Sequence, residues 1–183
     1  LLEIPGVLSM DELKSVTNAL AAARFVDGRL TAGVAAEKVK NNLELDRASE
    51  VRDPLSRALV GSLYRSETFR NAALPHRVAT PIVARYTRGM HYGDHIDDPI
   101  MGPDNGRYRT DISCTIALGG RDDYEGGELV IRTPFGEQSV GPGRRRSSGR
   151  QDRGPGCSVL RARTDHHRSW EVTDGPHEPH RIC

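Results

Sequence analysis

Long apolar runs and paired cysteines are scarce in this 183-residue sequence, and each shortage excludes a class of protein. No segment approaches the roughly 18 apolar residues that a membrane-spanning helix needs, so we expect no membrane partner. Three widely spaced cysteines, with no C-x-x-C pair, predict no disulfide framework; they are Cys114, Cys157 and Cys183. The first eight residues lack the basic region and apolar run of a signal peptide. Together these features favour a cytoplasmic protein.

The composition changes after residue 140. Residues 1–140 carry 17 basic and 20 acidic side chains, whereas residues 141–183 carry nine arginines, five acidic residues and few large apolar ones. The length fits a single domain, and we assign it to residues 1–140, followed by an atypical basic tail over 141–183. Three interpretations of the tail are open: a disordered terminus, a polyanion-binding segment built on Arg144–Arg146, or coding sequence read out of frame. We favour the last, because the chain has 23 arginines but only three lysines.

Two periodicities predict an α+β fold. Apolar residues at helical spacing favour a helical part over residues 1–75, and Ser9 with Glu12 forms a capping box at the first helix start. Alternating apolar residues separated by glycine turns predict antiparallel strands over residues 76–140, which would form a sandwich or barrel. The expected helices span 10–23, 49–64 and 67–73, and the expected strands lie within 2–7, 25–30, 39–45, 78–86, 92–97, 110–118 and 128–132.

A histidine and an aspartate two residues apart are the strongest chemical signal. His95 and Asp97 lie in the strand-like stretch Tyr-Gly-Asp-His-Ile-Asp (92–97), and residues i and i+2 of a strand share a face. One imidazole and one carboxylate are two corners of the 2-His-1-carboxylate triad that binds iron(II). The alternative is a chance pair at the surface, in a chain with 7 histidines and 25 acidic residues.

Further motifs follow one another along residues 2–140. They read Ile-Pro-Gly-Val-Leu-Ser (4–9), Val-Asp-Gly-Arg (26–29), Val-Lys-Asn-Asn (39–42), Arg-Thr-Asp-Ile-Ser (109–113) and Tyr-Glu-Gly-Gly-Glu-Leu-Val (124–130). With residues 92–97, and in this order and spacing, they resemble the PKHD-type hydroxylases, which are prolyl-4-hydroxylase-like iron(II)/2-oxoglutarate-dependent dioxygenases.

The resemblance implies a fold, cofactors and site residues. The fold would be a double-stranded β-helix (jelly roll) with N-terminal helices. The cofactors would be Fe(2+), 2-oxoglutarate as cosubstrate with dioxygen, and L-ascorbate to keep the iron ferrous. His95 and Asp97 would be iron ligands, and Tyr86 would face the 2-oxoglutarate pocket, although an ordinary core tyrosine is the alternative. Arg109 is more simply a structural arginine than a cosubstrate clamp.

The tail departs from the family pattern. The third histidine ligand would fall near position 158, which is Ser158, and the arginine that grips 2-oxoglutarate is not recognisable. His167 is the one candidate we name for the third ligand, but no apolar strand surrounds it. We therefore expect the final strands to be missing or disordered, and activity to be impaired. Two other functions stay open: a non-catalytic jelly roll that binds metal or carboxylate, and a nucleic-acid binder using the basic tail, which we rank last.

Overall fold

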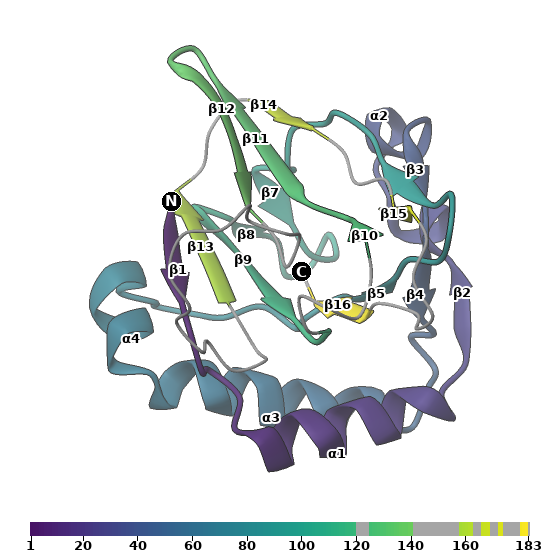
Figure 1. Cartoon of the computed structure of the whole chain (residues 1–183), viewed down its shortest axis with the longest axis vertical. Helices are drawn as coiled ribbons and strands as arrows, with labels where there is room; N and C mark the ends of the chain where they lie inside the picture. The colour runs from purple at the N-terminus through teal and green to yellow at the C-terminus, as the bar shows by residue number, and fades with distance from the viewer. Residues whose placement is uncertain (120–124, 141–157, 163–165, 169–171, 174–179, 183) are drawn as a thin grey trace.

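Helices and antiparallel strands make up this protein, as the α+β prediction required (Figure 1). The computed structural model describes residues 1–119, 125–140, 158–162, 166–168, 172–173 and 180–182, and the side chains of 1–33, 36–119 and 126–140. The helices are α1 (Met10–Ala21), the 3-10 helix η1 (Gly28–Thr31), α2 (Val34–Glu37), α3 (Arg52–Arg65) and α4 (Glu67–Ala73). None of the helices in these ranges is both long and apolar enough to cross a bilayer.

The largest sheet has seven strands in the order β1-β13-β9-β16-β5-β4-β2. A three-stranded sheet follows the order β12-β11-β14, and three two-stranded pairs join β3 with β6, β7 with β8, and β10 with β15. In the large sheet the bounds are β1 (Leu2–Ile4), β13 (Ser158–Ala162), β9 (Ile112–Ala117), β16 (His180–Ile182), β5 (Val83–Arg85), β4 (Leu43–Leu45) and β2 (Phe25–Asp27). The other strands are β12 (Gly136–Val140), β11 (Leu129–Thr133), β14 (His166–Arg168), β3 (Lys40–Asn41), β6 (His91–Tyr92), β7 (Ile100–Met101), β8 (Tyr108–Arg109), β10 (Glu125–Gly126) and β15 (Val172–Thr173).

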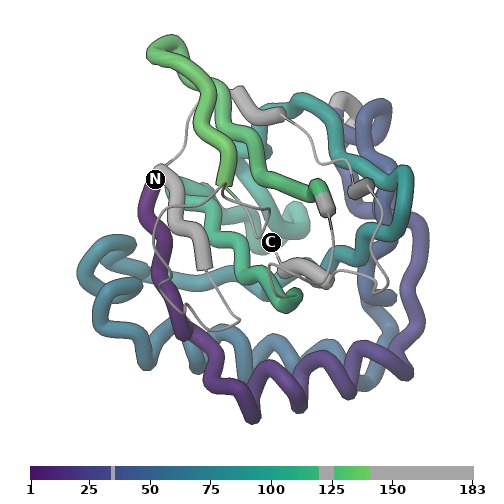
Figure 2. Tube along the Cα trace, in the orientation of Figure 1, coloured from purple at the N-terminus to yellow at the C-terminus, as the bar shows by residue number. Residues whose placement is uncertain are grey.

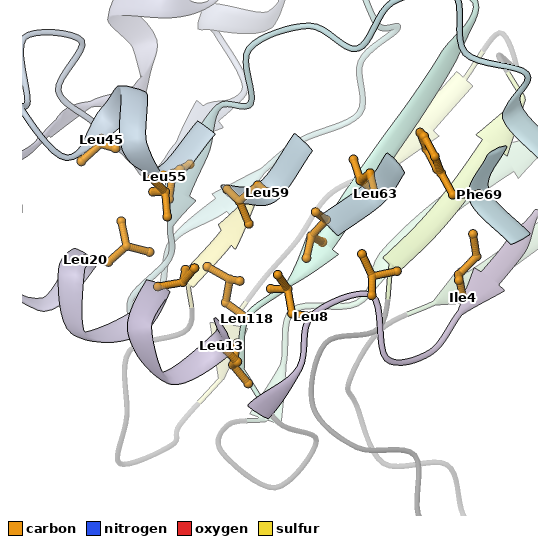
Figure 3. Close-up of a cluster of buried hydrophobic side chains, with 14 residues drawn as sticks. Ile4, Leu8, Leu13, Leu20, Leu45, Leu55, Leu59, Leu63, Phe69 and Leu118 are labelled. Atoms are coloured by element: carbon orange, nitrogen blue, oxygen red, sulfur yellow. The ribbon is translucent and has the colours of Figure 1, made fainter. Parts of the chain in front are cut away.

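The main core lies between the helices and the large sheet. Helices α1 and α3 run side by side below the sheet (Figure 2). Each presents leucines or valines three or four residues apart, the spacing that lines one helix face. Burying each such side chain contributes about 1.5–3 kcal/mol. The cluster includes Leu13, Val16 and Leu20 of α1, Leu55, Leu59 and Leu63 of α3, and Ile4, Val83 and Ile116 of the sheet (Figure 3).

A second, smaller core lies on the other face of β5. Val83 packs into the main core, whereas its neighbour Ala84 packs into the second cluster, because successive strand residues point to opposite faces. Tyr86, just after β5, also belongs to the second cluster. The remaining buried members are Leu129 and Ile131 of β11 and Val140 of β12, so this cluster joins the large sheet to the three-stranded one.

Several expected strands are shorter or divided. The stretch 2–7 forms a strand only at β1, and 25–30 only at β2, after which the 3-10 helix η1 begins. The stretch 39–45 splits into β3 and β4 at Asn42, because β3 pairs with β6 whereas β4 pairs with β2 and β5. The stretch 78–86 forms a strand only as β5, since Pro81 has no amide hydrogen to donate to a ladder.

The tail differs from the expectation that the final strands are missing or disordered. Strand β13 pairs with both β1 and β9, and β16 pairs with both β5 and β9. That expectation is therefore wrong for these backbone segments. They carry Val159, Leu160 and Ile182, residue types that favour strands. The segment 141–157, with the Arg144–Arg146 cluster, lies outside the described residues.

Candidate metal centre

The chain after β6 exposes alternate side chains. Asp94, Ile96 and Asp98 are exposed, while His95 and Asp97 are partly buried. Regular pairing of β6 ends at Tyr92, so the expected strand over 92–97 is shorter than predicted. The alternation nevertheless places His95 and Asp97 on the same, inner side of the chain, as their i, i+2 spacing predicts.

The two side chains point toward one another. His95 Nε2 lies 3.4 Å from Asp97 Oδ1, and the side chains are 13% and 32% exposed, respectively. An imidazole nitrogen and a carboxylate oxygen at this separation can both reach a single cation between them, at the bond lengths of about 2.0–2.2 Å found for such ligands.

A hydrogen bond fixes the orientation of the His95 ring. Its Nδ1 lies 2.7 Å from the Gly93 carbonyl oxygen. Because a carbonyl can only accept, Nδ1 must carry the hydrogen, and in the neutral ring the lone pair is then on Nε2. Metal-binding histidines commonly donate their other N–H to a carbonyl or carboxylate in this way. The nitrogen that faces Asp97 is therefore the one that can bind a metal.

Asp97 is oriented by a matching contact. The Ser113 hydroxyl of β9 donates to Asp97 Oδ2 at 2.6 Å, so it is the other oxygen, Oδ1, that faces His95. Ligating carboxylates are usually held in this manner by a second hydrogen bond. The two donor groups and the atoms that orient them therefore fit two of the three ligand positions of a 2-His-1-carboxylate iron(II) site.

The aromatic ring of Tyr92 supports the histidine from the side. Its centroid lies 3.8 Å from that of the His95 ring, with 10° between the planes, which is a stacked arrangement. Tyr92 also packs against the second core cluster, to which Tyr86 belongs. The Tyr86 ring is almost fully buried, and its phenol oxygen accepts a hydrogen bond from Asn42 Nδ2 at 3.1 Å.

The described side chains provide two candidate ligands, His95 and Asp97. Within those ranges, no group of three or more histidine, cysteine, aspartate or glutamate side chains is arranged to hold a metal. His167 lies on β14, paired opposite Ile131 of β11, and its side chain is outside the described residues. Ser158 begins β13 opposite Ile116. Arg109 forms an exposed ion pair with Asp111 at 2.8 Å, as expected for a structural arginine.

Sequence reasoning overlooked the residues that orient the pair. Gly93, Tyr92 and Ser113 all occur within the motifs 92–97 and 109–113, but the motifs do not reveal which side chains meet. Ser113 is a partly buried polar residue of β9, in which Ile116 is buried. The available signal was this hydroxyl, on a strand that follows the segment with Asp97. It could have indicated a donor for that carboxylate.

Comparisons with known proteins show what the chain is similar to. No family model matches the chain. Over 140 residues it is 49% identical to a PKHD-type hydroxylase of Thioalkalivibrio sulfidiphilus, an alignment that covers 76% of this chain and 62% of that relative. The chain thus spans less than two thirds of the length of the curated relative it matches.

Solved structures share the fold at low identity. A Pseudomonas putida prolyl-4-hydroxylase matches with a TM-score of 0.57 at 16% identity, over 99% of this chain and 88% of that one. An oxidoreductase of the 2OG-Fe(II) oxygenase family from Burkholderia pseudomallei matches with a TM-score of 0.58 at 16% identity, over 99% and 81%. At such identities the likeness concerns the fold alone.

Proposed function

Because this chain is a homologue of the PKHD-type hydroxylases over 76% of its length, we propose that it carries the site of an iron(II)- and 2-oxoglutarate-dependent dioxygenase, with His95 and Asp97 as two of the iron ligands. One observation carries the proposal. His95 Nε2 and Asp97 Oδ1 lie 3.4 Å apart, and each group is oriented by a hydrogen bond to its other polar atom.

The residues of the chain would bind and orient the metal. Iron(II) with 2-oxoglutarate and dioxygen supplies oxidative decarboxylation of the cosubstrate and hydroxylation of a second substrate, with ascorbate keeping the iron ferrous. Gly93 keeps the proton of His95 on Nδ1, so that Nε2 stays available as a ligand. Ser113 holds Oδ2 of Asp97, and Tyr92 covers one face of the His95 ring, which restricts water there.

The fold around this site is proposed to be a double-stranded β-helix. The seven-stranded and three-stranded sheets would be its two layers, with the second core cluster between them. Tyr86 lies in that cluster and shares Tyr92 as a neighbour with His95. We propose that its phenol faces the 2-oxoglutarate carboxylate, with Asn42 holding the ring in place through the hydrogen bond at 3.1 Å.

The third ligand is proposed to come from β14. His167 is the candidate that the sequence offers, and its backbone is paired opposite Ile131 of β11. The neighbouring His166 is paired opposite Arg132. Replacing His167 with alanine should reduce metal affinity if it completes the triad, and His166→Ala is the matched control.

Succinate formation tests the enzymatic proposal. Purified protein with iron(II), 2-oxoglutarate and ascorbate should form succinate, and the rate should fall to background in His95→Ala. His91→Ala is the control, because His91 is an exposed histidine on β6 outside the pair. Equal rates in the wild type and in His95→Ala would contradict a role for this site in turnover.

Metal binding without turnover is the second candidate function. It is favoured by the observation that the described side chains gather two ligands, not three. A site of this kind would bind cobalt(II), an oxygen-stable substitute for iron(II), and lose it in His95→Ala, while no succinate forms in the wild type. Succinate formation that depends on His95 would exclude this alternative.

A further inference from the structure

We propose that the buried ion pair Lys40–Glu44 is a positioning device for His95, acting through Tyr92. This inference depends on the proposed function only in its expected effect on metal affinity. The effect on the His95 ring does not depend on it. Lys40 Nζ lies 2.5 Å from Glu44 Oε1, and the two side chains are 6% and 4% exposed. They come from the segment 40–44, far from His95 in sequence.

The ion pair is held in one place by its surroundings. Lys40 Nζ also donates to the Thr31 hydroxyl at 3.2 Å, and that hydroxyl donates to the other oxygen of Glu44. A buried ion pair contributes little to stability compared with apolar residues of the same volume, because both charges lose their hydration. Its geometry, however, is specific. A role in fixing the position of a neighbour therefore explains such a pair better than stability alone.

Tyr92 is that neighbour. The Lys40 ammonium lies 5.1 Å from the centroid of the Tyr92 ring, within the distance at which a cation is attracted to an aromatic face. Lys40 and Tyr92 are also directly opposed in the β3–β6 pair. The same ring stacks on His95 at 3.8 Å. One aromatic side chain thus contacts both the buried charge and the proposed ligand.

The backbone of the same segment holds the carbonyl that orients His95. The Gly93 amide donates to the Val39 carbonyl at 2.7 Å. A methyl group added at Gly93 would lie 2.7 Å from Val39 Cβ, so only glycine allows this approach. Gly93 in turn accepts the hydrogen bond from His95 Nδ1. Residues 39–40 therefore contact both the residue whose ring stacks on His95 and the residue whose carbonyl selects the His95 tautomer.

Two test variants and two control variants separate positioning from folding. Lys40→Met combined with Glu44→Leu removes both charges without leaving one of them buried and unpaired. Tyr92→Leu removes the ring, while Tyr92→Phe keeps it. Lys38→Ala controls for loss of a lysine charge, because Lys38 is exposed. Circular dichroism identifies any variant that does not fold, and at least one of the two test variants must fold for the comparison.

The first measurement needs no metal. Nitrogen NMR of the His95 imidazole in the metal-free protein reports which ring nitrogen carries the hydrogen. The wild type, Tyr92→Phe and Lys38→Ala should show hydrogen on Nδ1, whereas Tyr92→Leu and the double variant should show a mixture of both forms. If both test variants carry the His95 hydrogen on Nδ1 alone, as the wild type should, the proposal is overturned.

The second measurement is cobalt(II) affinity. Loss of groups that orient a metal ligand typically lowers affinity 10–100-fold, and we expect a fall of that order in Tyr92→Leu and in the double variant, against less than twofold in the two controls. Affinity equal to the wild type in both test variants would also overturn the proposal. If His95→Ala binds cobalt(II) with the same affinity as the wild type, the proposed function is contradicted instead. The tautomer measurement then still decides whether Lys40 and Tyr92 position His95.

Discussion

At the scale of single residues, hydrogen bonds determine which atoms of His95 and Asp97 face one another. Each side chain has two polar atoms, and in each the atom pointing away from the pair is occupied, by Gly93 for His95 and by Ser113 for Asp97. The pair is therefore arranged before any metal arrives. Such preorganisation lowers the entropic cost of binding.

Removing the Ser113 hydroxyl should weaken metal binding without unfolding the protein. Ser113→Ala leaves Asp97 able to rotate, and loss of an orienting partner of this kind costs about 10–100-fold in metal affinity. Ser113→Thr keeps a hydroxyl at the same position and should retain most of the affinity. Cobalt(II) titration of both variants tests this, and equal affinities in Ser113→Ala and the wild type would show that Ser113 does not orient the ligand.

Asp27 provides a prediction about pH. Hydrogen bonds from the Arg29 side chain, and then from its backbone amide, lower the pKa of Asp27 from 3.8 to about 2. A carboxyl whose pKa is lowered by folding contributes stability that is fully present above its unfolded pKa, and that contribution is lost as the pH falls through the folded value. The contribution of Asp27 should therefore disappear between about pH 4 and pH 2.

Carboxyl carbon chemical shifts can follow this titration directly. The Asp27 signal should titrate with a midpoint near pH 2 in the wild type, and Arg29→Gln should move the midpoint upward toward 3.8. A wild-type Asp27 midpoint already near 3.8 would contradict the role of Arg29.

At the scale of elements, local signals predicted the helices better than the strands. The capping box of Ser9 and Glu12 is present at the start of α1, and α4 covers the predicted range 67–73. These signals act within one turn of helix, so the sequence contains them completely. The division at Asn42 could not be predicted in this way, because it depends on pairing with β2, β5 and β6, which are distant in sequence.

Gly28 should tolerate no side chain. A methyl group there would lie 2.0 Å from Asn42 Oδ1, which is buried and holds Tyr86 through its amide. Gly28→Ala should therefore destabilise the protein by about 1–3 kcal/mol, the usual cost of overpacking. Gly61→Ala is the opposite control, because Gly61 lies inside α3 with nothing closer than 3.8 Å, and alanine there should stabilise by about 0.5–1 kcal/mol.

Urea unfolding of the two glycine variants measures these changes in the free energy of unfolding. If Gly28→Ala is as stable as the wild type, Asn42 can move aside without cost, and its hydrogen bond to Tyr86 does not hold the ring. The changes in the free energy of unfolding should have opposite signs in the two variants. A general effect of adding a methyl group would give both the same sign.

At the scale of the whole molecule, the sheets join segments that lie far apart in sequence. Strand β13 separates β1 from β9, and β16 separates β9 from β5. The motifs of residues 2–140 predicted helices with antiparallel strands, and the placement of His95 and Asp97 on one side of the chain. They could not predict the pairing of β13, β14 and β16, because strand pairing over such separations depends on tertiary packing and not on local composition.

Deleting residues 141–183 should therefore disrupt the large sheet. The remaining chain would have exposed edges on β1, β9 and β5, and unpaired edges promote aggregation. Size-exclusion chromatography should show larger, aggregated species than the full chain forms, and thermal unfolding should show a broader transition. A 1–140 fragment that elutes without aggregates and keeps the melting temperature of the full chain would mean that β13 and β16 contribute nothing to the fold.

Cobalt(II) binding to the full chain is the measurement that tests the metal centre most directly. Electronic absorption should show one bound ion in the wild type and in His91→Ala, whose histidine is exposed and outside the pair. The signal should be lost in His95→Ala and strongly weakened in Asp97→Ala. Binding that persists unchanged in both of these variants would contradict the assignment of His95 and Asp97 as metal ligands.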